Sequence, residues 1–483
     1  MCSLFILIQK NTDHVVCNYE SSFVKLPKWE IESGFDPESV VVSRPAWVTL
    51  QGEIPSPTIP VVSAEEVLKG TVFDINSLPI RDPDCFLSGQ IHENVPKWKE
   101  ILCDEGMGSG EVLQWPQKGV NVYEFFKHFK GNFKGKAYNS DVPPKQYFPN
   151  SGTCIPFVKF ICSELCERIA TGSLKLLGRV GMCVPPKVVM PITIEPSKPR
   201  LCHDERFLNL WVKDSPFHLE TLRDIPRIVG HNSLMVTCDE KSGYDHVKLT
   251  EDSQTYFGIQ YGGYFMTYTT IPFGFKASPF IYQTIGMNVT SYLRGLGVLN
   301  ILYIDDRFVV TEIKRELDED ASLIEGLKLS YVLLELLTRL GYTLSLKKCS
   351  LDPSRCKKFL GFFVDSEKQA FILPQDKRLK FSDLREFILS RKEIDLRTLQ
   401  RFSGKCISMS IAVPGCKLFC SEVNSGISFS VRNSKSVQVS NALRAELEHW
   451  RFLDNWSGFV SGGRNFTSAL KYQRILRDTD MVL

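Results

Sequence analysis

Two apolar segments that suit β-strands, residues 300–303 and 308–310, bracket the adjacent acidic residues Asp305 and Asp306. Neighbouring carboxylates at the end of an apolar strand repel one another and resist burial. A tight, exposed turn that carries Asp-Asp by chance would explain the pattern. Divalent cations would also explain it, because they offset the repulsion and need oxygen ligands. The segment predicts a strand hairpin with an acidic turn, and taken alone it leaves both explanations open.

A third carboxylate follows another apolar segment. Residues 234–238 have the composition of a strand and lead into Asp239, which is followed by the segment 240–244. A carboxylate at one strand end that faces a hairpin tipped by two more is what a two-metal phosphoryl-transfer site requires. The two acidic groups, in this order, therefore favour metal-assisted chemistry over chance.

The bulk properties of the chain exclude few classes of protein. Its 483 residues allow several packed subdomains or two to three domains, and its net charge of +3 neither demands nor excludes a nucleic-acid partner. The 15 cysteines show no pairing pattern or zinc-like spacing, which favours reduced thiols in an intracellular protein. No apolar run approaches the roughly 20 residues of a membrane span, and no signal peptide is recognisable. We therefore expect a soluble, intracellular protein without a membrane partner, in either the nucleus or the cytoplasm.

Local patterns predict several regular elements. Apolar periodicity and turn residues indicate helices at 155–178, 320–340 and 376–405, a strand at 188–194, a hairpin at 257–268 around Gly262-Gly263, and a polar linker at 433–440. The second helix has an apolar stripe of Leu323, Leu327, Tyr331 and Leu334, and Gly341 can cap its end. Residues 98–154 are aromatic and basic and could stack on bases, although aromatic residues at this spacing are more often part of a core.

The motifs, taken in order, resemble those of reverse transcriptases. Asp239 with Tyr244 is similar to the first palm motif, and Tyr303-Ile304-Asp305-Asp306 is similar to the third. The remaining similarities are the fingers segment at 198–209, the second palm motif at 271–283, the fourth motif at 340–349 and the primer grip at 359–362. The wording within these motifs looks most like retrotransposons of the tyrosine-recombinase, DIRS-like order.

The resemblance implies an α+β right-hand polymerase fold, with fingers, a palm built on an antiparallel sheet, and a helical thumb. The expected domains are an irregular, partly disordered leader at 1–90, an N-terminal extension that packs on the fingers at 91–184, fingers and palm at 185–365, a thumb-like helical region at 366–432, and a linker with a truncated tail at 433–483. The chain departs from the family after about residue 461, so we expect no RNase H domain.

The resemblance also implies roles for individual residues. The catalytic carboxylates would be Asp239, Asp305 and Asp306, and together with the backbone carbonyl of Glu240 they would hold two Mg²⁺ ions, for which Mn²⁺ is a possible substitute. The incoming nucleotide would contact Lys198, Arg200, Tyr244, Phe273, Gly274 and Lys348, with Lys347 as the neighbouring alternative to Lys348. The template or primer would contact Lys276, Ser278, Pro279, Gln283, Leu360 and Gly361.

Some residues near these motifs are expected to have other roles. Tyr244 occupies the position whose bulky ring excludes a ribose 2′-hydroxyl, which implies selection of deoxynucleotides. Asp245 alternates away from Tyr244 along the chain, and His246 is expected to be structural. Asp204 and Arg206 are expected to pair within the fingers.

The implied function is that of an RNA-directed DNA polymerase of a retrotransposon. It would add dNTPs to a primer 3′-hydroxyl on an RNA or DNA template, and its oligomeric state is left open. The bulk of Tyr244 disfavours an RNA-dependent RNA polymerase. A catalytically silent retroelement remnant that binds nucleic acid remains an alternative, because intact acidic residues do not demonstrate activity.

Overall fold

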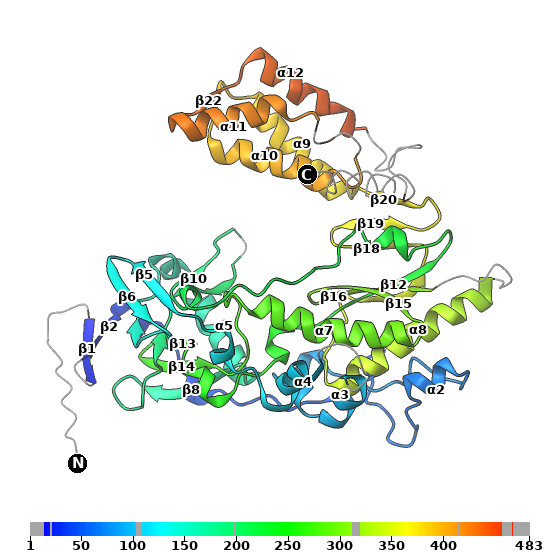
Figure 1. Ribbon diagram of the computed structural model, residues 1–483, viewed down its shortest axis with the longest axis horizontal. Helices are drawn as coiled ribbons and strands as arrows, with labels where there is room; N and C mark the ends of the chain where they lie inside the picture. The colour runs from blue at the N-terminus through cyan, green and yellow to red at the C-terminus, as the bar shows by residue number, and fades with distance from the viewer. Residues whose placement is uncertain are drawn as a thin grey trace. The chain divides into compact units, whose positions relative to one another are not determined.

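The computed structural model describes residues 14–19, 22–102, 109–197, 199–311, 319–413, 416, 418–455 and 466. The chain divides into two compact units (Figure 1). Unit 1 consists of residues 1–219, 239–292 and 331–347, and unit 2 of residues 220–238, 293–330 and 348–483.

Unit 1 is built around a five-stranded sheet with the strand order β7-β9-β13-β14-β8. Its strands are β7 (Gln146–Tyr147), β9 (Val188–Val189), β13 (Gly258–Tyr261), β14 (Tyr264–Tyr268) and β8 (Leu174–Arg179). The hairpin predicted around Gly262-Gly263 is confirmed, and both glycines have positive φ, at 57° and 84°. The turn therefore depends on residues that enter the left-handed region without cost.

Unit 1 has further regular elements beside those of the sheet. Its strands are β1 (His14–Tyr19), β2 (Ser22–Pro27), β3 (Trp47–Val48), β4 (Ile80–Arg81), β5 (Phe129–Phe133), β6 (Lys136–Ser140), β10 (Ile192–Ile194) and β11 (Leu201–His203). Its helices are α1 (Lys28–Ile31), α2 (Ala64–Leu68), α3 (Val95–Leu102), α4 (Ser109–Lys118), α5 (Val158–Ala170), α6 (Glu251–Gln254) and most of α7 (Ser278–Gly295).

Two sequence predictions in unit 1 were wrong at their boundaries. The helix predicted at 155–178 is α5, which ends at Ala170; Gly172 then takes a φ of +76° and the chain enters β8. Leu174–Arg179 pairs with β14, so burial in a sheet overrides the helical periodicity. The strand predicted at 188–194 is divided at Pro191, which has no N–H to donate to a ladder, into β9 and β10.

The described residues from Leu26 to Gln90 are packed, whereas the expected partial disorder of the leader stays a prediction. Regular elements are short in residues 26–90, as expected, but Leu78, Ile80 and Phe86 are buried. The N–H of Ala64, at the start of α2, donates to Glu335 Oε2 over 3.0 Å, and this contact anchors the segment on α8. The residues before His14 lie outside the described part of the chain.

The aromatic segment 98–154 contributes mainly to the core, as the sequence favoured. Trp98, Trp115, Phe125 and Tyr138 are buried. The segment is not one helix, however, because residues 129–140 form the β5–β6 hairpin, whose turn residues Lys134 and Gly135 have φ values of 48° and 81°.

Unit 2 contains a four-stranded sheet, a three-stranded sheet and a group of helices. The larger sheet has the order β15-β16-β12-β17, with strands β15 (Leu299–Tyr303), β16 (Asp306–Thr311), β12 (Leu234–Asp239) and β17 (Ser350–Ser354). The smaller sheet consists of β18 (Cys356–Phe359), β19 (Phe362–Asp365) and β20 (Ala370–Ile372). One hydrophobic core runs from the strands into the helices, and it includes Met235, Phe308, Phe359 and Phe402.

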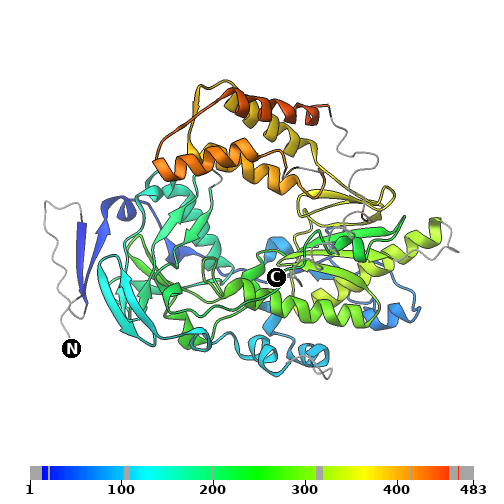
Figure 2. The ribbon, with the colours of Figure 1, turned by 45° about the horizontal axis from the view of Figure 1, so that its top comes forward.

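The helices of unit 2 lie together beside the smaller sheet (Figures 1 and 2). They are α9 (Gln375–Leu389), α10 (Leu396–Met409), α11 (Ser421–Asn433) and α12 (Asn441–His449). The helix predicted at 376–405 is two helices, because the short strand β21 (Glu393–Ile394) separates them. The predicted linker contains β22 (Val437–Gln438), which pairs with β21.

Helix α8 (Glu319–Leu340) confirms the predicted helix at 320–340. Gly341 has a φ of +97° and ends it, as expected. The predicted apolar stripe holds at Tyr331 and Leu334, which are buried, but Leu323 is 43% exposed. Across the helices that the structure describes, none is both long and apolar enough to cross a membrane.

A buried carboxyl in unit 1 gives the fold a testable dependence on pH. Glu30 on α1 is 1% exposed, and its Oε1 accepts a hydrogen bond from the Asn150 side chain over 3.0 Å. Burial raises the pKa of this carboxyl from 4.5 to about 7. The folded protein therefore binds the proton more tightly than the unfolded chain does, and the free energy of unfolding falls as the pH rises from about 4.5 to about 7.

We expect Glu30→Gln to remove this decline, which amounts to at most about 3 kcal/mol. The measurement is urea unfolding of both proteins at pH 5 and pH 8. Glu32→Gln is the matched control, because Glu32 is exposed at the end of the same helix. An equal loss of stability between the two pH values in native protein and Glu30→Gln would contradict the assignment.

Candidate functional site

The acidic turn predicted from the sequence is the β15–β16 turn of unit 2. Tyr303 pairs with Asp306 across the hairpin, so Ile304 and Asp305 are its two turn residues. Ile304 has a φ of +57°, a left-handed conformation that costs a β-branched residue about 1–2 kcal/mol. Backbone strain of this kind persists where the surroundings enforce it, and it is concentrated at functional sites.

A partly exposed ion pair supports the hairpin from its outer edge. The Glu220 carboxylate accepts the Leu302 N–H over 2.8 Å and pairs with Arg294 over 2.6 Å. Arg294 also donates to the carbonyl of Asn300 over 2.6 Å. Sequence reasoning missed Glu220 and Arg294, and no spacing pattern could have linked two residues so far apart to this strand.

Asp239 is the last residue of β12, the strand next to β16 in the sheet. Its side chain is 9% exposed, and that of Glu240 is 1% exposed. In unit 1 the backbone around them is fixed on both sides, because Ser345 N–H donates to the Asp239 carbonyl over 2.8 Å and Lys241 N–H donates to the Thr343 carbonyl over 2.9 Å. The backbone that carries the Asp239 carboxylate is therefore held in place by hydrogen bonds.

Two of the predicted nucleotide-binding residues, Tyr244 and Phe273, are in contact in unit 1. Their ring centroids lie 4.6 Å apart. Tyr244 is 8% exposed, whereas Phe273 is 60% exposed. The pair presents one open aromatic surface backed by a buried ring.

Gly274, next to Phe273, lies in a turn that no other residue fits. Its φ is +98°, and a Cβ there would lie 2.5 Å from the carbonyl oxygen of His203. The Asn209 side chain holds the turn, since its Nδ2 donates to the Gly274 carbonyl over 2.8 Å and its Oδ1 accepts the Lys276 N–H over 2.9 Å. Asn209 ended the predicted fingers segment but was given no role of its own.

The residues predicted to contact template or primer in the same region have varied surroundings. The Ser278 hydroxyl donates to the Pro272 carbonyl over 2.9 Å, and Gln283 is 1% exposed. Lys276 is exposed and pairs with Asp214, while Pro279 is half-buried. Their contact with nucleic acid stays a prediction.

The phosphate-binding candidates lie on exposed segments. Arg200 is exposed between β10 and β11, and Lys347 and Lys348 are exposed before β17. Lys198 lies outside the described residues. Their roles also stay predictions.

The residues given other roles behave as expected. The Asp204 carboxylate pairs with Arg206 over 2.6 Å. The Asp245 carboxylate lies 3.9 Å from the Arg168 guanidinium, and burial raises the pKa of this carboxyl. His246 is fully buried, which lowers its pKa to about 4, so the neutral ring accepts the Thr343 N–H at Nε2 over 3.0 Å. Its Nδ1 is then the donor to the Gly243 carbonyl, 3.1 Å away.

In unit 2 the turn predicted as the primer grip lies against a basic helical surface. Leu360 and Gly361 have φ values of 43° and 78° and connect β18 to β19. Lys377 from α9 lies 4.0 Å from the centroid of the Phe362 ring, beside Gly361. We call Lys358, Lys377, Lys380, Arg401 and Lys405 the thumb cation cluster. Burial lowers the pKa of both Lys377 and Lys405. Neighbouring cations lower it further, although the adjacent Asp376 acts in the opposite direction on Lys377.

The metal that the sequence implies for these carboxylates is Mg²⁺. Mg²⁺ prefers oxygen ligands, and proteins commonly hold it with one or two carboxylates, waters and substrate phosphates. Asp305 and Asp306 are half-buried and supply such oxygens. Within the described residues, no group of three or more His, Cys, Asp or Glu side chains is arranged to hold a metal by itself. The oxygen donors of Asp305 and Asp306 are of the kind that Mg²⁺ prefers, and the metal itself stays a prediction.

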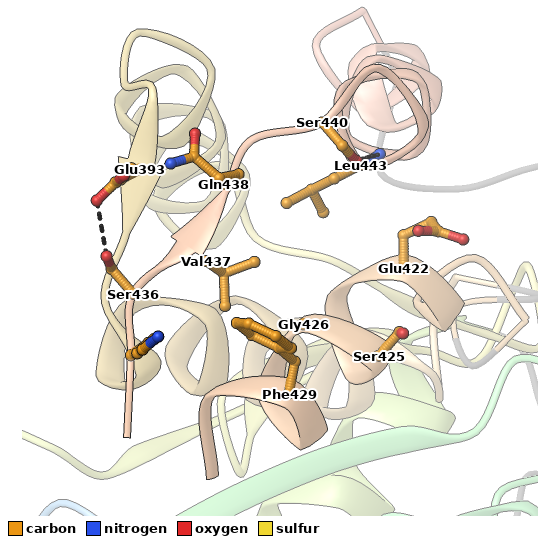
Figure 3. A pocket seen from close by; sticks show the side chains of 11 residues that line it. Glu393, Glu422, Ser425, Gly426, Phe429, Ser436, Val437, Gln438, Ser440 and Leu443 are labelled. Atoms are coloured by element: carbon orange, nitrogen blue, oxygen red, sulfur yellow. Dashed lines mark hydrogen bonds between the residues drawn. The ribbon is translucent and has the colours of Figure 1, made fainter. Parts of the chain in front are cut away.

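A separate hollow of about 710 Å³ lies among the C-terminal helices of unit 2 (Figure 3). Val437 and Phe429 form its apolar side, and Glu393 hydrogen-bonds to Ser436 at its edge. It contains none of the predicted site residues.

Comparison with solved structures identifies the fold. The chain is similar to "Structure of the foamy viral protease-reverse transcriptase in complex with RNA/DNA hybrid", with a TM-score of 0.52 and 19% identity over 76% of this chain and 47% of that one. It is also similar to "Structure of the foamy viral protease-reverse transcriptase dRH in complex with ds DNA", with a TM-score of 0.53 and 17% identity over 93% of this chain and 78% of that one. The chain has the right-hand polymerase fold.

The sequence comparisons give the family of the central segment. Residues 195–364 match the family described as "Reverse transcriptase (RNA-dependent DNA polymerase)", and this segment is a reverse transcriptase domain. The "Enzymatic polyprotein" of Figwort mosaic virus (strain DxS) is 27% identical over 213 residues, which is 43% of this chain. The chain spans 28% of the length of that polyprotein.

The Gly274 turn gives a prediction that is independent of activity. We expect Gly274→Ala to lower the free energy of unfolding by about 2–4 kcal/mol, because it combines left-handed strain with an overpacked contact against the His203 carbonyl. Urea unfolding measures the change. Gly152→Ala is the matched control in the same unit, since a Cβ there meets no atom within 4 Å. Equal stability of the two variants would contradict the described turn.

Proposed function

We propose that this chain is an RNA-directed DNA polymerase that adds dNTPs to a primer 3′-hydroxyl. The observation that carries the proposal is the acidic turn between β15 and β16, in which Ile304 is strained. Strand β16 lies next to β12, which ends in Asp239, and both strands belong to the segment that matches the reverse transcriptase family. The likeness to structures in complex with RNA/DNA hybrid and with double-stranded DNA supports a template–primer duplex as the partner.

We assign Asp239, Asp305, Asp306 and the backbone carbonyl of Glu240 to two Mg²⁺ ions, for which Mn²⁺ is a possible substitute. When bound, such ions activate the primer hydroxyl and stabilise the leaving pyrophosphate. The chain's own contribution is positioning, because the Glu220–Arg294 pair fixes the acidic hairpin and the Ser345 N–H fixes the backbone of Asp239.

The remaining roles follow the same assignment. Arg200 binds the triphosphate with its planar guanidinium donors, and the Lys198 ammonium binds the same group as a point charge. Lys348 donates a proton to the departing pyrophosphate. The Tyr244–Phe273 pair receives the sugar, and the ring of Tyr244 excludes a 2′-hydroxyl. Gly274 allows the backbone to approach the nucleotide. Lys276, Ser278, Pro279 and Gln283 follow the template, and the Leu360–Gly361 turn holds the primer. The wording of the motifs further supports an origin in a DIRS-like retrotransposon.

The acidic turn gives the first test of activity. We expect the native chain to extend oligo-dT on poly-rA with Mg²⁺, and the Asp305→Asn, Asp306→Asn variant to lose at least about 1,000-fold in rate, because charge stabilisation by the carboxylates is lost. Primer extension on gels measures both rates. No extension by the native chain above that variant would contradict the proposed activity, and ribonucleotide incorporation equal to that of dNTPs would contradict the role of Tyr244.

The thumb cation cluster gives a test of duplex binding. We expect Arg401→Ala, Lys405→Ala to weaken binding of a DNA duplex and to reduce the slope of log K against log salt by up to about 1.8, since each phosphate contact contributes about 0.9. Fluorescence anisotropy at several salt concentrations measures this slope. Lys368→Ala, Lys435→Ala removes the same charge from exposed positions of unit 2 outside α9 and α10 and should leave the slope unchanged. Equal slopes for the two double variants would contradict the assignment.

A further inference from the structure

We propose that Tyr282 and Glu240 form a buried hydrogen-bonded pair that positions the Tyr244 ring and thereby sets discrimination between deoxyribonucleotides and ribonucleotides. The inference rests on the proposed function, and it adds a positioning residue, Tyr282, to which the sequence analysis assigned no role. All of the contacts that carry it lie within unit 1.

The first contact joins helix α7 to the residue after Asp239. The Tyr282 hydroxyl donates to Glu240 Oε2, and both side chains are 1% exposed. A buried carboxylate is costly unless donors satisfy it, and a hydrogen bond to a charged group is worth more than one between neutral groups. The two side chains therefore hold one another in a single arrangement.

The second contact joins the Tyr282 ring to the turn that carries Tyr244. A Cβ on Gly243 would lie 3.1 Å from Tyr282 Cζ and 3.2 Å from its Cε1, so the backbone of this turn rests directly on the ring. The preceding residue, Ser242, has a φ of +51°, which is uncommon for a residue with a side chain. The turn is thus strained on one side and supported by Tyr282 on the other.

The third contact is between the rings themselves. The ring of Tyr282 packs edge to face against the ring of Tyr244, with centroids 5.6 Å apart. The ring of Tyr244 in turn packs against the exposed ring of Phe273, with centroids 4.6 Å apart. His246 Nδ1 also donates to the Gly243 carbonyl over 3.1 Å. Tyr244 is consequently fixed by its neighbours on the chain and by the ring of Tyr282.

A ring that excludes a 2′-hydroxyl must keep its position to within a fraction of an ångström. Loss of the Tyr282 hydroxyl would release the ring of Tyr282 from Glu240 and allow Tyr244 to shift, whereas the volume of the core would be almost unchanged. The effect should therefore appear in discrimination between sugars more than in the rate with dNTPs. The position of a side chain that contacts substrate commonly depends on the residues that pack and hydrogen-bond behind it.

The test compares kcat/KM for dTTP and for UTP on poly-rA/oligo-dT in the native chain, Tyr282→Phe, Glu240→Met and the double variant. We expect the dTTP-to-UTP ratio to fall at least tenfold in Tyr282→Phe, while kcat/KM for dTTP stays within threefold of native. The ratio in the double variant should equal that of the single variants rather than their combined effects, because both remove the same hydrogen bond. Tyr256→Phe is the matched control, since it removes another buried hydroxyl of unit 1, one that bonds to Lys187.

The outcomes separate this inference from the proposed function. No extension by the native chain means that the proposed function fails, and the inference fails with it. Native extension together with a ratio in Tyr282→Phe within twofold of native, or the same loss in Tyr256→Phe, overturns the inference alone. A Tyr282→Phe protein that melts like the native chain but extends neither nucleotide also overturns it, because the hydroxyl would then serve the chemistry. If Tyr282→Phe does not fold, the dTTP-to-UTP ratio in Glu240→Met decides. A ratio at least tenfold below the native ratio supports the inference, and a ratio within twofold of it overturns the inference.

Discussion

Repulsion between neighbouring carboxylates is the constraint around which the rest of the chain is arranged. Asp305 and Asp306 follow an apolar strand at a turn in which Ile304 is strained, and the sheet places the strand ending in Asp239 next to that hairpin. Such an arrangement is unfavourable in isolation, because like charges and left-handed backbone both raise its free energy. Bound cations would lower this free energy, because they offset the repulsion between the carboxylates.

Much of the surrounding structure holds the backbone of these motifs in place. Asn209 holds the Gly274 turn, Glu220 and Arg294 hold the edge of β15, and His246 joins the Gly243 carbonyl to Thr343. Each of these side chains reaches a main-chain group that lies far away in the sequence or in another element. Polar side-chain contacts therefore hold the backbone of these motifs within each unit.

The sequence predicted the local features that arise from short-range rules. The Gly262-Gly263 hairpin, the end of α8 at Gly341 and the strands around Asp305 depend on positive φ values and alternation that neighbouring residues encode. The predictions failed where tertiary pairing decided the outcome. Leu174–Arg179 continues a helical pattern yet pairs with β14, and Leu323 extends the α8 stripe yet is exposed. The supporting residues Glu220, Asn209 and Tyr282 could not be predicted, because their partners are distant in the sequence and carry no common spacing.

The central claim is that the carboxylates of Asp239 and of the Asp305–Asp306 turn hold divalent cations in the presence of a nucleotide. The most direct measurement is anomalous scattering from Mn²⁺ in crystals of the chain with a chain-terminated template–primer and the matching dNTP. The account predicts anomalous peaks in contact with Asp239 and Asp305. Mn²⁺ bound only elsewhere, with a dNTP ordered in the crystal, would contradict it.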